Sequence, residues 1–499
     1  MPGTCGSGRL KAVRAPHRVA WLLLAWTTAA HAQVAAVGGA LSIPAGPGTA
    51  PVRWPAVAWD ADANVYLAVS GAGAIMGQFV SADGVAQGAP FPVNEGSAYA
   101  QAPRVAWGAP GFFVTWHETV GQATRVRGRI VRFGQPPLTG DFDVSPLGTN
   151  WEMGAAMAFS AASSEYLVAW QNFSTAAIEA QRVSGSGALK GGVLTVAPAP
   201  EYHRDPGVAW NALSNEFVVG FAGCVGTDDC YLALQRVAAG TGALLGGPVL
   251  LDSSAVAVYV PELSFDAARG RVLAVWYRRD GSGASFHARA LEADGSVAGP
   301  AALVTASFGS YDANSLAWNA TSGSFLFVTH GTTSEDLALE LSSSGAPLGA
   351  AVPFGPASAN GNFNPRVAAN GAQAEWLAVT STQFASLSAQ RFSTQTRSGG
   401  GAGGGGGTGG GAGGGSPDDA GTGGGAPDDA GTGGGAPDDA GTGGGVAGGG
   451  GGAGAGEADG GAGGGSIESS GSCRCSMTSG EALALLALLA WALRPRAAG

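Results

Sequence analysis

A row of arginines is the first group of side chains in this sequence that could do chemistry together. Arg125, Arg127 and Arg129 are separated from one another by single residues. Because successive side chains of a β-strand point to opposite faces, the three guanidinium groups are expected on one face of a sheet. Such a stripe could receive an anionic glycan or another surface polymer. A merely solvated strand face is the alternative interpretation.

The histidines offer a second, weaker candidate. His117, His203, His287 and His330 are scattered along the chain after the N-terminal segment. Two of them, His117 and His330, occupy the same position in two different repeats, just after an apolar run. Loops at one position of a repeat lie on one face of a repeat protein, so a shared site is conceivable. The two repeats are not neighbours, and this weakens the idea.

Signals for metal binding and catalysis are poor. The segment Asp60–Asn64 begins like a calcium-binding loop, but Val65 stands where such a loop has glycine and Gly71 where it has an acid. An ordinary hairpin turn is the favoured interpretation. No Ser/His/Asp order, nucleophile elbow or phosphate-binding loop is recognisable. We therefore assign no catalytic residue and expect neither a metal nor a cofactor.

Two cysteines fall within the central part of the chain. Cys224 and Cys230 have five residues between them. In an oxidising compartment, this spacing predicts a local disulfide that closes one loop. A metal site is the alternative, but no histidine is near in the sequence and two sulfurs alone do not make a zinc site.

Seven similar segments position all of these residues. Each has a short apolar run that ends in an anchor residue, then a turn rich in Asp, Asn, Ser and Gly, then a second apolar run. The segments are 57–69, 105–116, 157–170, 208–221, 263–276, 316–329 and 367–380. Their anchors are Trp59, Trp107, Phe159, Trp210, Phe265, Trp318 and Ala369, which are 48, 52, 51, 55, 53 and 51 residues apart.

The repeat predicts the fold. Third and fourth apolar runs follow in each unit, so that four strands fit into about 50 residues, seven times over. This predicts an all-β, seven-bladed β-propeller with four-stranded blades, in which the anchor aromatics fill the gaps between blades. The last unit ends after its third strand, so the N-terminal residues 40–46 (ALSIPAG) are expected to supply the fourth and close the ring. Paired β-sandwiches or an open solenoid are the alternatives.

Arginine also recurs on the third strands of the repeats. Arg129, Arg182, Arg236 and Arg391 are interpreted as occupants of one position. Recurrence across several blades indicates a structural role, such as pairing with acids or covering aromatic rings, rather than one binding site.

Charge and composition divide the chain. The predicted propeller, 33–397, has a formal charge of −8, and residues 398–472 contain nine acids, no base and a large share of the 87 glycines. The latter segment, with its three ten-residue copies, cannot bury apolar area and is expected to be a disordered stalk. The acidic body argues against nucleic acid as a partner. We expect a monomer.

Both ends of the chain have the features of targeting segments. Residues 1–32 have four basic residues, an apolar run and an Ala-His-Ala site, which together predict a secretory signal peptide. Near the other end, the apolar segment Ala482–Leu493 has 12 residues. As a helix it would be roughly 18 Å long, against a hydrocarbon core of about 30 Å, which is too short for a comfortable permanent anchor.

The C-terminal segment 473–499 resembles the MYXO-CTERM sorting domain of myxobacterial surface proteins. In that family a cysteine precedes a short helix and arginines follow it, as do Cys473, Cys475, Arg494 and Arg496 here. The arginines of this chain are interrupted by Pro495. The resemblance implies cleavage near the cysteines by a sortase-like protease, attachment to the membrane by the tail or by lipid, and display on the outer cell surface.

The repeats themselves resemble propellers of exported bacterial proteins with units of the type VAWN…YLVVW. The Asp-box of sialidases, the Gly-Gly of kelch repeats and the Trp-Asp of WD40 repeats are absent. We expect a surface-displayed binding or adhesion protein that uses one propeller face to bind a polymer or protein. The alternative is a polysaccharide hydrolase or lyase with its site at the channel mouth. Clustered carboxylates there would favour the enzyme, and aromatic and arginine clusters would favour binding.

Overall fold

The computed structural model describes most of the predicted propeller. The described residues are 33–43, 53–96, 99–148, 155–225, 229–255, 257–281, 283–333, 335–355, 362–382 and 386–395. The predicted signal peptide, the stalk and the tail with Cys473 and Cys475 lie outside them. No helix in the described part of the chain is long and apolar enough to cross a membrane.

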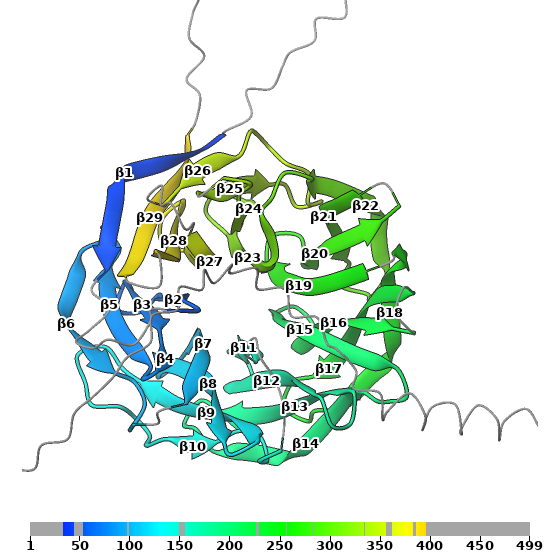
Figure 1. The fold of residues 1–499 in the computed structure, drawn as a ribbon, viewed down its shortest axis with the longest axis horizontal. Coiled ribbons are helices and arrows are strands. Elements are labelled where there is room, and N and C mark those ends of the chain that lie inside the picture. Colours follow the sequence, from blue (N-terminus) through cyan, green and yellow to red (C-terminus); the bar gives the residue numbers. More distant parts are fainter. Residues whose placement is uncertain are drawn as a thin grey trace, which may run out of the picture. The chain divides into compact units, whose positions relative to one another are not determined.

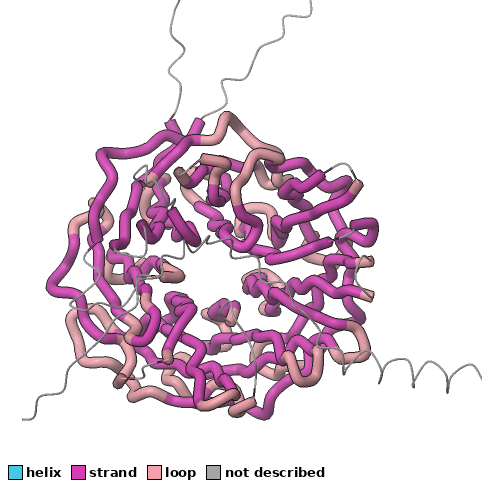
Figure 2. Tube along the Cα trace, viewed as in Figure 1, coloured by secondary structure: helices cyan, strands magenta, loops and turns pink. Residues whose placement is uncertain are grey.

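Seven antiparallel sheets are arranged as blades around a central axis (Figure 1), which confirms the predicted seven-bladed β-propeller. Strands and loops make up the described residues, without helices (Figure 2). In each blade the strand that follows the previous blade is the innermost one, and the last strand lies at the periphery.

The strands of the seven blades are as follows. Blade 1 has β2 (Ala56–Asp60), β3 (Val65–Ser70), β5 (Met76–Ser81) and β6 (Ala86–Pro92). Blade 2 has β7 (Ala100–Gly108), β8 (Gly111–Val120), β9 (Ala123–Val131) and β10 (Phe142–Asp143), with β4 (Ala72–Gly73) added at the inner edge. Blade 3 has β11 (Ala156–Ser160), β12 (Glu165–Asn172), β13 (Ala177–Ser184) and β14 (Leu189–Ala197). Blade 4 has β15 (Tyr202–Asn211), β16 (Glu216–Cys224), β17 (Cys230–Ala238) and β18 (Leu244–Ala255).

The other three blades complete the ring. Blade 5 has β19 (Ala257–Asp266), β20 (Arg271–Asp280), β21 (Gly283–Leu291) and β22 (Val297–Thr305). Blade 6 has β23 (Ser310–Asn319), β24 (Ser324–His330), β25 (Asp336–Leu341) and β26 (Val352–Phe354). Blade 7 has β27 (Asn362–Asn370), β28 (Glu375–Thr382), β29 (Ser386–Gln395) and β1 (Gln33–Ile43).

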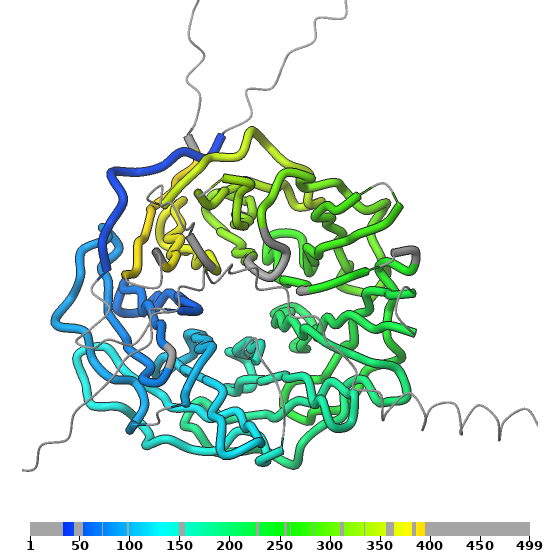
Figure 3. Tube along the Cα trace, viewed as in Figure 1, coloured from blue at the N-terminus to red at the C-terminus, as the bar shows by residue number. Residues whose placement is uncertain are grey.

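The N-terminal strand closes the ring, as predicted. Strand β1 pairs with β29 from Gln33↔Gln395 to Ile43↔Leu387, so the first described strand lies beside the last (Figure 3). The pairing strand is longer than the predicted segment and begins seven residues earlier. Its Gly38, at φ 68°, matches the glycine bulges of other outer strands. Those glycines are Gly88, Gly191, Gly246 and Gly299.

A glutamine on the third strand supports these bulges. Gln181 Nε2 donates to the carbonyls of Lys190 and Gly191 on the outer strand of its own blade, at 3.2 and 3.4 Å. Gln390 Nε2 donates in the same way to the Val37 carbonyl of β1, at 3.1 Å. The N-terminal strand therefore makes the contacts of an ordinary fourth strand, although about 350 residues separate the partners.

The core lies between blades, not within them. Each hydrophobic cluster combines residues of two neighbouring blades, as Phe113 and Tyr166 do for blades 2 and 3. The anchors were expected to fill the gaps between blades, and this is only partly right. The first aromatic residue of the second strand, such as Tyr66 or Tyr166, is the fully buried one. The anchor covers it, as Trp59 covers Tyr66 with ring centroids 4.6 Å apart.

The turns between first and second strands are locked locally. Asp60 Oδ1 accepts hydrogen bonds from the backbone N–H groups of Asp62 and Ala63, at 2.8 and 3.0 Å. Asn211, Asp266, Asn319 and Asn370 make the same kind of turn in other blades. Segment Asp60–Asn64 is thus a hairpin turn that uses its own carboxylate. No group of three metal-ligating side chains occurs among the described residues.

Candidate functional site

The variable side of the ring is the one where the second strands end and the third strands begin. We call it the upper face. Antiparallel pairing also places the start of each inner strand there, whereas the uniform turns at Asp60 and its equivalents lie on the opposite face. A rigid scaffold that carries variable loops on one face commonly has its functional residues on that face.

The predicted arginine stripe of blade 2 lies on the third strand, β9, but its charge is neutralised. Arg125 bonds to Glu118 at 2.5 Å and to Asp143 at 2.9 Å, and Arg127 contacts the same two carboxylates. Burial by itself raises the pKa of Glu118, but the hydrogen bonds and charges of the two arginines lower it below its usual value. Asp141 and Asp143 follow the stripe in the sequence, and their carboxylates neutralise part of the positive charge of the arginines. The stripe is an ion-pair network rather than an open cationic surface.

The third-strand arginines do not all occupy one position. Arg182, Arg236 and Arg391 pair with carboxylates at the start of the second strand, at 3.3, 2.8 and 2.7 Å. The partner carboxylates are those of Glu165, Glu216 and Glu375. This confirms the predicted structural role for the three.

Arg129 is shifted by one residue from that position. It lies opposite Val114, two residues after the first aromatic residue of its second strand, whereas Arg182 lies opposite Leu167, one residue after. A shift of one residue turns a strand side chain to the other face of the sheet. Arg129 therefore reaches the preceding blade, where it donates to the Val93 carbonyl at 2.9 Å. Assigning it to the common position was wrong.

The two histidines that share a position are not brought together. His117 belongs to blade 2 and His330 to blade 6, and blades 7 and 1 lie between them on the shorter way around the ring (Figure 1). His330 Nδ1 lies 3.0 Å from the Asp336 carboxylate on the next strand of its own blade. His117 is fully buried, and burial followed by the charge of Arg104 lowers its pKa to about 3. The charged group that acts on each histidine, Arg104 for His117 and Asp336 for His330, belongs to the same blade as that histidine.

Cys224 and Cys230 form a disulfide at the upper end of blade 4. They are directly opposite each other in the ladder of β16 and β17, so the bond closes the loop between these strands. The disulfide lies next to a group of aromatic residues that sequence analysis did not single out.

These residues form what we call the aromatic arc, which crosses blades 3, 4 and 5 at the upper face. It consists of Phe173, Tyr202, Tyr231, Tyr259 and Tyr277 together with Arg204. All except the largely buried Tyr277 are exposed or half-exposed. The sequence offered one clue, because Tyr202 and Arg204 flank His203 at the start of the inner strand that contains Pro206.

Contacts within the arc link blade 3 to blade 4 and blade 4 to blade 5. Phe173 meets Tyr202 edge-on, with centroids 5.7 Å apart. The guanidinium carbon of Arg204 lies 3.8 Å from the ring centre of Tyr259. Tyr259 in turn stacks on Tyr277 with an interplanar angle of 22°. Cation–π and stacking contacts therefore join two inner strands, β15 and β19, with the second strand β20 of blade 5.

Hydrogen bonds hold the tyrosines in place. The Tyr202 hydroxyl accepts from Gln171 Nε2 at 2.8 Å, and the Tyr231 hydroxyl donates to the Glu201 carboxylate. The hydroxyl of Tyr231 also lies 3.1 Å from Nε2 of His203. Burial, followed by the Glu201 carboxylate, raises the pKa of Tyr231, and burial lowers that of His203. At neutral pH this group combines a neutral imidazole, a phenol and a carboxylate.

A second site, in the channel, was also missed by sequence analysis. The cavity has a volume of about 120 Å³ and is lined by inner-strand residues of four consecutive blades, which places it in the central channel. Its charged lining residues are Arg104 of blade 2 and Glu262 of blade 5. Arg366 of blade 7 bonds to Glu262 at 3.0 Å and donates to the Asn314 carbonyl of blade 6.

A repeated backbone feature positions these three side chains. A proline stands four residues before the anchor in five blades, at Pro55, Pro103, Pro206, Pro261 and Pro365. The residue before it has a positive φ in four of them, Trp54, Ala102, Asp205 and Asn364. The inner strand bulges at this point, for example between Gln101 and Arg104. Aligning the repeats on their anchors would have placed Arg104, Glu262 and Arg366 at one position, three residues before the anchor.

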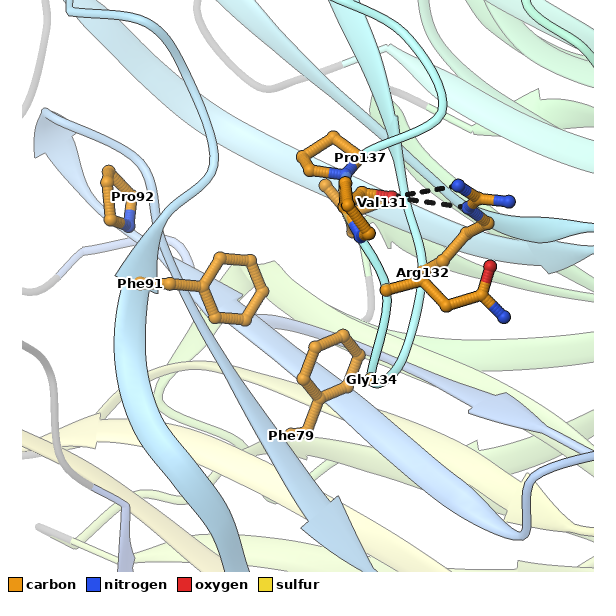
Figure 4. A pocket seen from close by; sticks show the side chains of 9 residues that line it. Phe79, Phe91, Pro92, Val131, Arg132, Gly134 and Pro137 are labelled. Atoms are coloured by element: carbon orange, nitrogen blue, oxygen red, sulfur yellow. Dashed lines mark hydrogen bonds between the residues drawn. The ribbon is translucent and has the colours of Figure 1, made fainter.

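A further pocket, of about 460 Å³, lies at the periphery between blades 1 and 2 (Figure 4). Phe79 and Phe91 form one wall, and the loop around Pro137 forms the other. The guanidinium of Arg132 is engaged with the Pro136 carbonyl of the same loop. The walls are therefore apolar, without a converging set of polar groups.

Comparison with known proteins identifies no family and finds solved structures of low similarity. No protein-family model matches the chain, and no curated protein matches it. Among solved structures, it is similar to the hydrazine synthase of Kuenenia stuttgartiensis, with 11% identity over 69% of this chain and 97% of that chain and a TM-score of 0.48. It is also similar to the Cps50 (Swd1) β-propeller domain of Myceliophteria thermophila, with 12% identity over 69% and 100% of the two chains and a TM-score of 0.41. An endo-arabinanase from Bacillus licheniformis gives 10% identity over 52% and 100%, with a TM-score of 0.31.

Proposed function

We propose that this protein is an exported, surface-displayed binding protein that holds an extracellular polymer on the upper face of blades 3 to 5. The observation that carries the proposal is the aromatic arc, in which Arg204 lies over Tyr259 and Tyr259 stacks on Tyr277. Tyrosine and arginine are over-represented among the residues that dominate binding energy.

The arc is suited to binding because its side chains are already ordered. Tyr202 and Tyr231 are held by Gln171 and Glu201, and Arg204 by the ring of Tyr259. Side chains that are fixed before the ligand arrives lose little conformational entropy on binding, which otherwise costs about 0.5–1.5 kcal/mol for each flexible side chain. Tyrosine also combines an apolar ring with a polar hydroxyl, so that it can contact both the faces and the edges of a sugar ring.

The extent of the arc favours a polymer. It crosses three blades from the exposed ring of Phe173 to the stack of Tyr259 and Tyr277. The carboxylates of Asp205 and Asp252 are paired with Arg204 and Arg278, so these strands add little net positive charge to a predicted propeller that is acidic as a whole. A neutral polysaccharide therefore fits this surface better than an anionic one, because like charges would repel the latter.

Export and attachment belong to the same proposal. The predicted signal peptide 1–32 would direct the chain out of the cytoplasm, and the acidic stalk would separate the propeller from the membrane. A protease acting near Cys473 or Cys475 would replace the tail by lipid. The positively charged Arg494 and Arg496 would stay on the cytoplasmic side, which leaves the propeller outside.

Hydrolysis of a polysaccharide is the alternative activity. Burial, opposed by Arg366 and Arg104, raises the pKa of Glu262, which would suit a general acid. Glycoside hydrolases mostly use two carboxyl groups about 5 to 9.5 Å apart. Glu262 is the one carboxyl group among the residues that line the channel cavity. Binding without turnover is thus the activity that the described geometry favours.

Affinity electrophoresis tests the proposal. The purified protein is run through gels that contain dextran, xylan or alginate, and each polymer is also assayed for new reducing ends. We expect retardation by a neutral polymer, and at least a tenfold loss of affinity in Tyr259→Ala. Tyr99→Ala is the matched control, because Tyr99 is 68% exposed but lies in blade 2.

The outcomes separate the alternatives. Equal affinity of Tyr259→Ala and Tyr99→Ala would overturn the assignment to the arc. Formation of new reducing ends would show that the protein hydrolyses the polymer instead of only binding it. If surface proteins were retained and no polysaccharide were, the ligand would be a protein and not a polymer.

A further inference from the structure

One carboxylate beside the aromatic arc has no cationic partner among the residues that the structure describes. Glu201 directly precedes Tyr202 of the arc, and its side chain is 40% exposed. Its Oε2 accepts a hydrogen bond from the Tyr231 hydroxyl and lies 3.7 Å from Nε2 of His203. Burial lowers the pKa of His203, so this imidazole is neutral at pH 7. The negative charge of Glu201 is therefore not neutralised by the two groups that it contacts.

The electrostatic surroundings of Glu201 favour a cation. The carboxylates of Asp205 and Asp252 on the neighbouring strands are each paired with an arginine, whereas Glu201 is bonded to a phenol. Burial raises the pKa of Tyr231, and the hydrogen bond and the charge of Glu201 raise it further. The predicted propeller has a formal charge of −8, which attracts cations over longer distances. A positively charged ligand group is thus favoured at this point of the upper face.

The hydrogen-bonding capacity that this group leaves for a ligand consists of acceptors. A phenol has a single hydrogen, and that of Tyr231 is donated to Glu201. The contact of 3.1 Å between Nε2 of His203 and the Tyr231 oxygen therefore requires Nε2 to donate. Both donors are used within the group, and the carboxylate keeps Oε1 and a lone pair of Oε2 for other partners. A ligand that binds here must supply the hydrogens.

A protonated amine meets both requirements. It carries a positive charge and three N–H donors, and it has no acceptor. Hydrogen bonds between two charged groups are roughly twice as strong as those between neutral groups. A sugar hydroxyl, in contrast, supplies one hydrogen and no charge. Uncharged sugar units can at the same time contact the aromatic rings next to Glu201.

We propose that the polymer held by the aromatic arc carries free amino groups, as a partly deacetylated aminoglycan does, and that Glu201 binds one of them as an ammonium ion. This inference rests on the proposed function, because it names the class of polymer that the same site takes. Tyr231 and His203 position the carboxylate, and sugar units without an amino group lie on the rings. Neutral polymers therefore bind to the arc as well, but more weakly.

Isothermal titration calorimetry of the purified protein compares two ligands with the same backbone. One is a partly deacetylated chitin oligosaccharide, and the other is the same oligosaccharide after N-acetylation, which removes its charge. At pH 6 and low salt we expect at least tenfold tighter binding of the form with free amino groups. The difference should shrink at high salt, which screens the ionic contact. Glu201→Gln keeps the size of the side chain and should bind both forms with nearly equal affinity.

Glu335→Gln is the matched control for the loss of charge. It removes a carboxylate from another half-exposed glutamate of the upper face, in the loop between β24 and β25 of blade 6. This variant should keep the preference of the parent for the amino form. The acids of the predicted stalk are present in the parent and in both variants, so any contribution from them is the same in all three proteins.

Equal affinity of the parent for the two forms would overturn the inference, and so would an unchanged preference in Glu201→Gln. In either case, retardation by dextran or xylan that is lost in Tyr259→Ala would leave the proposed function standing. If neither oligosaccharide nor any other polymer bound, the proposed function would fail together with the inference. Poly-lysine is a third probe. If it bound more tightly than the amino oligosaccharide and depended on Glu201, the ligand would be a basic protein, which would overturn the assignment to a polysaccharide.

Discussion

Closure of the ring by β1 can be tested through two side chains. Val34 and Ile43 are each 2% exposed, and they are nine positions apart, so they point to opposite faces of blade 7. Val34 packs with residues of blades 6 and 7, whereas Ile43 packs with residues of blades 7 and 1. The strand thus fills both interfaces of the blade that it completes. The double variant Val34→Ala, Ile43→Ala removes both contacts and leaves the backbone ladder intact.

The expected loss of stability follows from the volume removed. Truncating a buried isoleucine to alanine costs about 2–5 kcal/mol, and removing the two methyl groups of valine about 1.5 kcal/mol before any cavity term. The two side chains lie in different clusters, so their effects should add. We therefore expect the double variant to lose about 5 kcal/mol.

Urea unfolding followed by tryptophan fluorescence measures this loss. Hydrogen exchange should show in addition that the amides of β29 lose protection before those of β16, because β29 is the strand that β1 covers. Ser42→Ala is the matched control, since Ser42 is an exposed residue of the same strand. A double variant that unfolds within about 0.5 kcal/mol of this control would refute closure by β1.

Three further predictions concern other parts of the chain. Because the pKa of His117 is lowered to about 3, the unfolded chain binds a proton below about pH 6.5 that the folded protein does not bind. The free energy of unfolding should therefore fall on acidification by up to about 1.4 kcal/mol per pH unit. Urea unfolding at pH 7 and 5 should show that His117→Gln lacks this contribution to the pH dependence. In Gly223→Ala the new Cβ would overlap the ring of Tyr231, so polymer affinity should fall in affinity electrophoresis, whereas Gly192→Ala, with open space around it, should bind like the parent. We also predict that the mature protein ends near Cys473 or Cys475 and carries lipid there; mass spectrometry that finds an unmodified C-terminal peptide including Trp491 would contradict this.

The architecture was predictable because its signals are local and repeated. An anchor, a turn and an apolar run within about 14 residues define one hairpin, and seven copies at similar spacing define the number of blades. Closure was predictable for a related reason, since the last repeat lacks a fourth strand and an unused apolar segment precedes the first. The spacing of Cys224 and Cys230 also predicted the pairing that the structure has.

The register of the third strand of blade 2 and the pairing of its arginines with carboxylates could not be deduced from the repeat. Arg129 looked equivalent to Arg182, but strand pairing places it opposite Val114, one position away from the equivalent of Arg182 and so on the other face of the sheet. The arginine stripe looked basic because its carboxylates come from three separate places, which are Glu118 on the neighbouring strand, Asp143 on a later strand and Asp141 in a connection of irregular length.

What the sequence determined by itself is the blade and its repetition, whereas the targeting segments at the two ends of the chain stay predictions. Only the tertiary structure decided which side chains of different blades meet. Arg104 and Arg366 are 262 positions apart, yet both lie within reach of Glu262 because seven blades bend into a ring and bring their inner strands to one axis. Tyr259 meets Arg204 for the same reason, since these side chains lie at the ends of adjacent inner strands. Contacts within a blade depend on short-range pattern, whereas contacts between blades depend on the curvature of the whole ring, which no single repeat encodes.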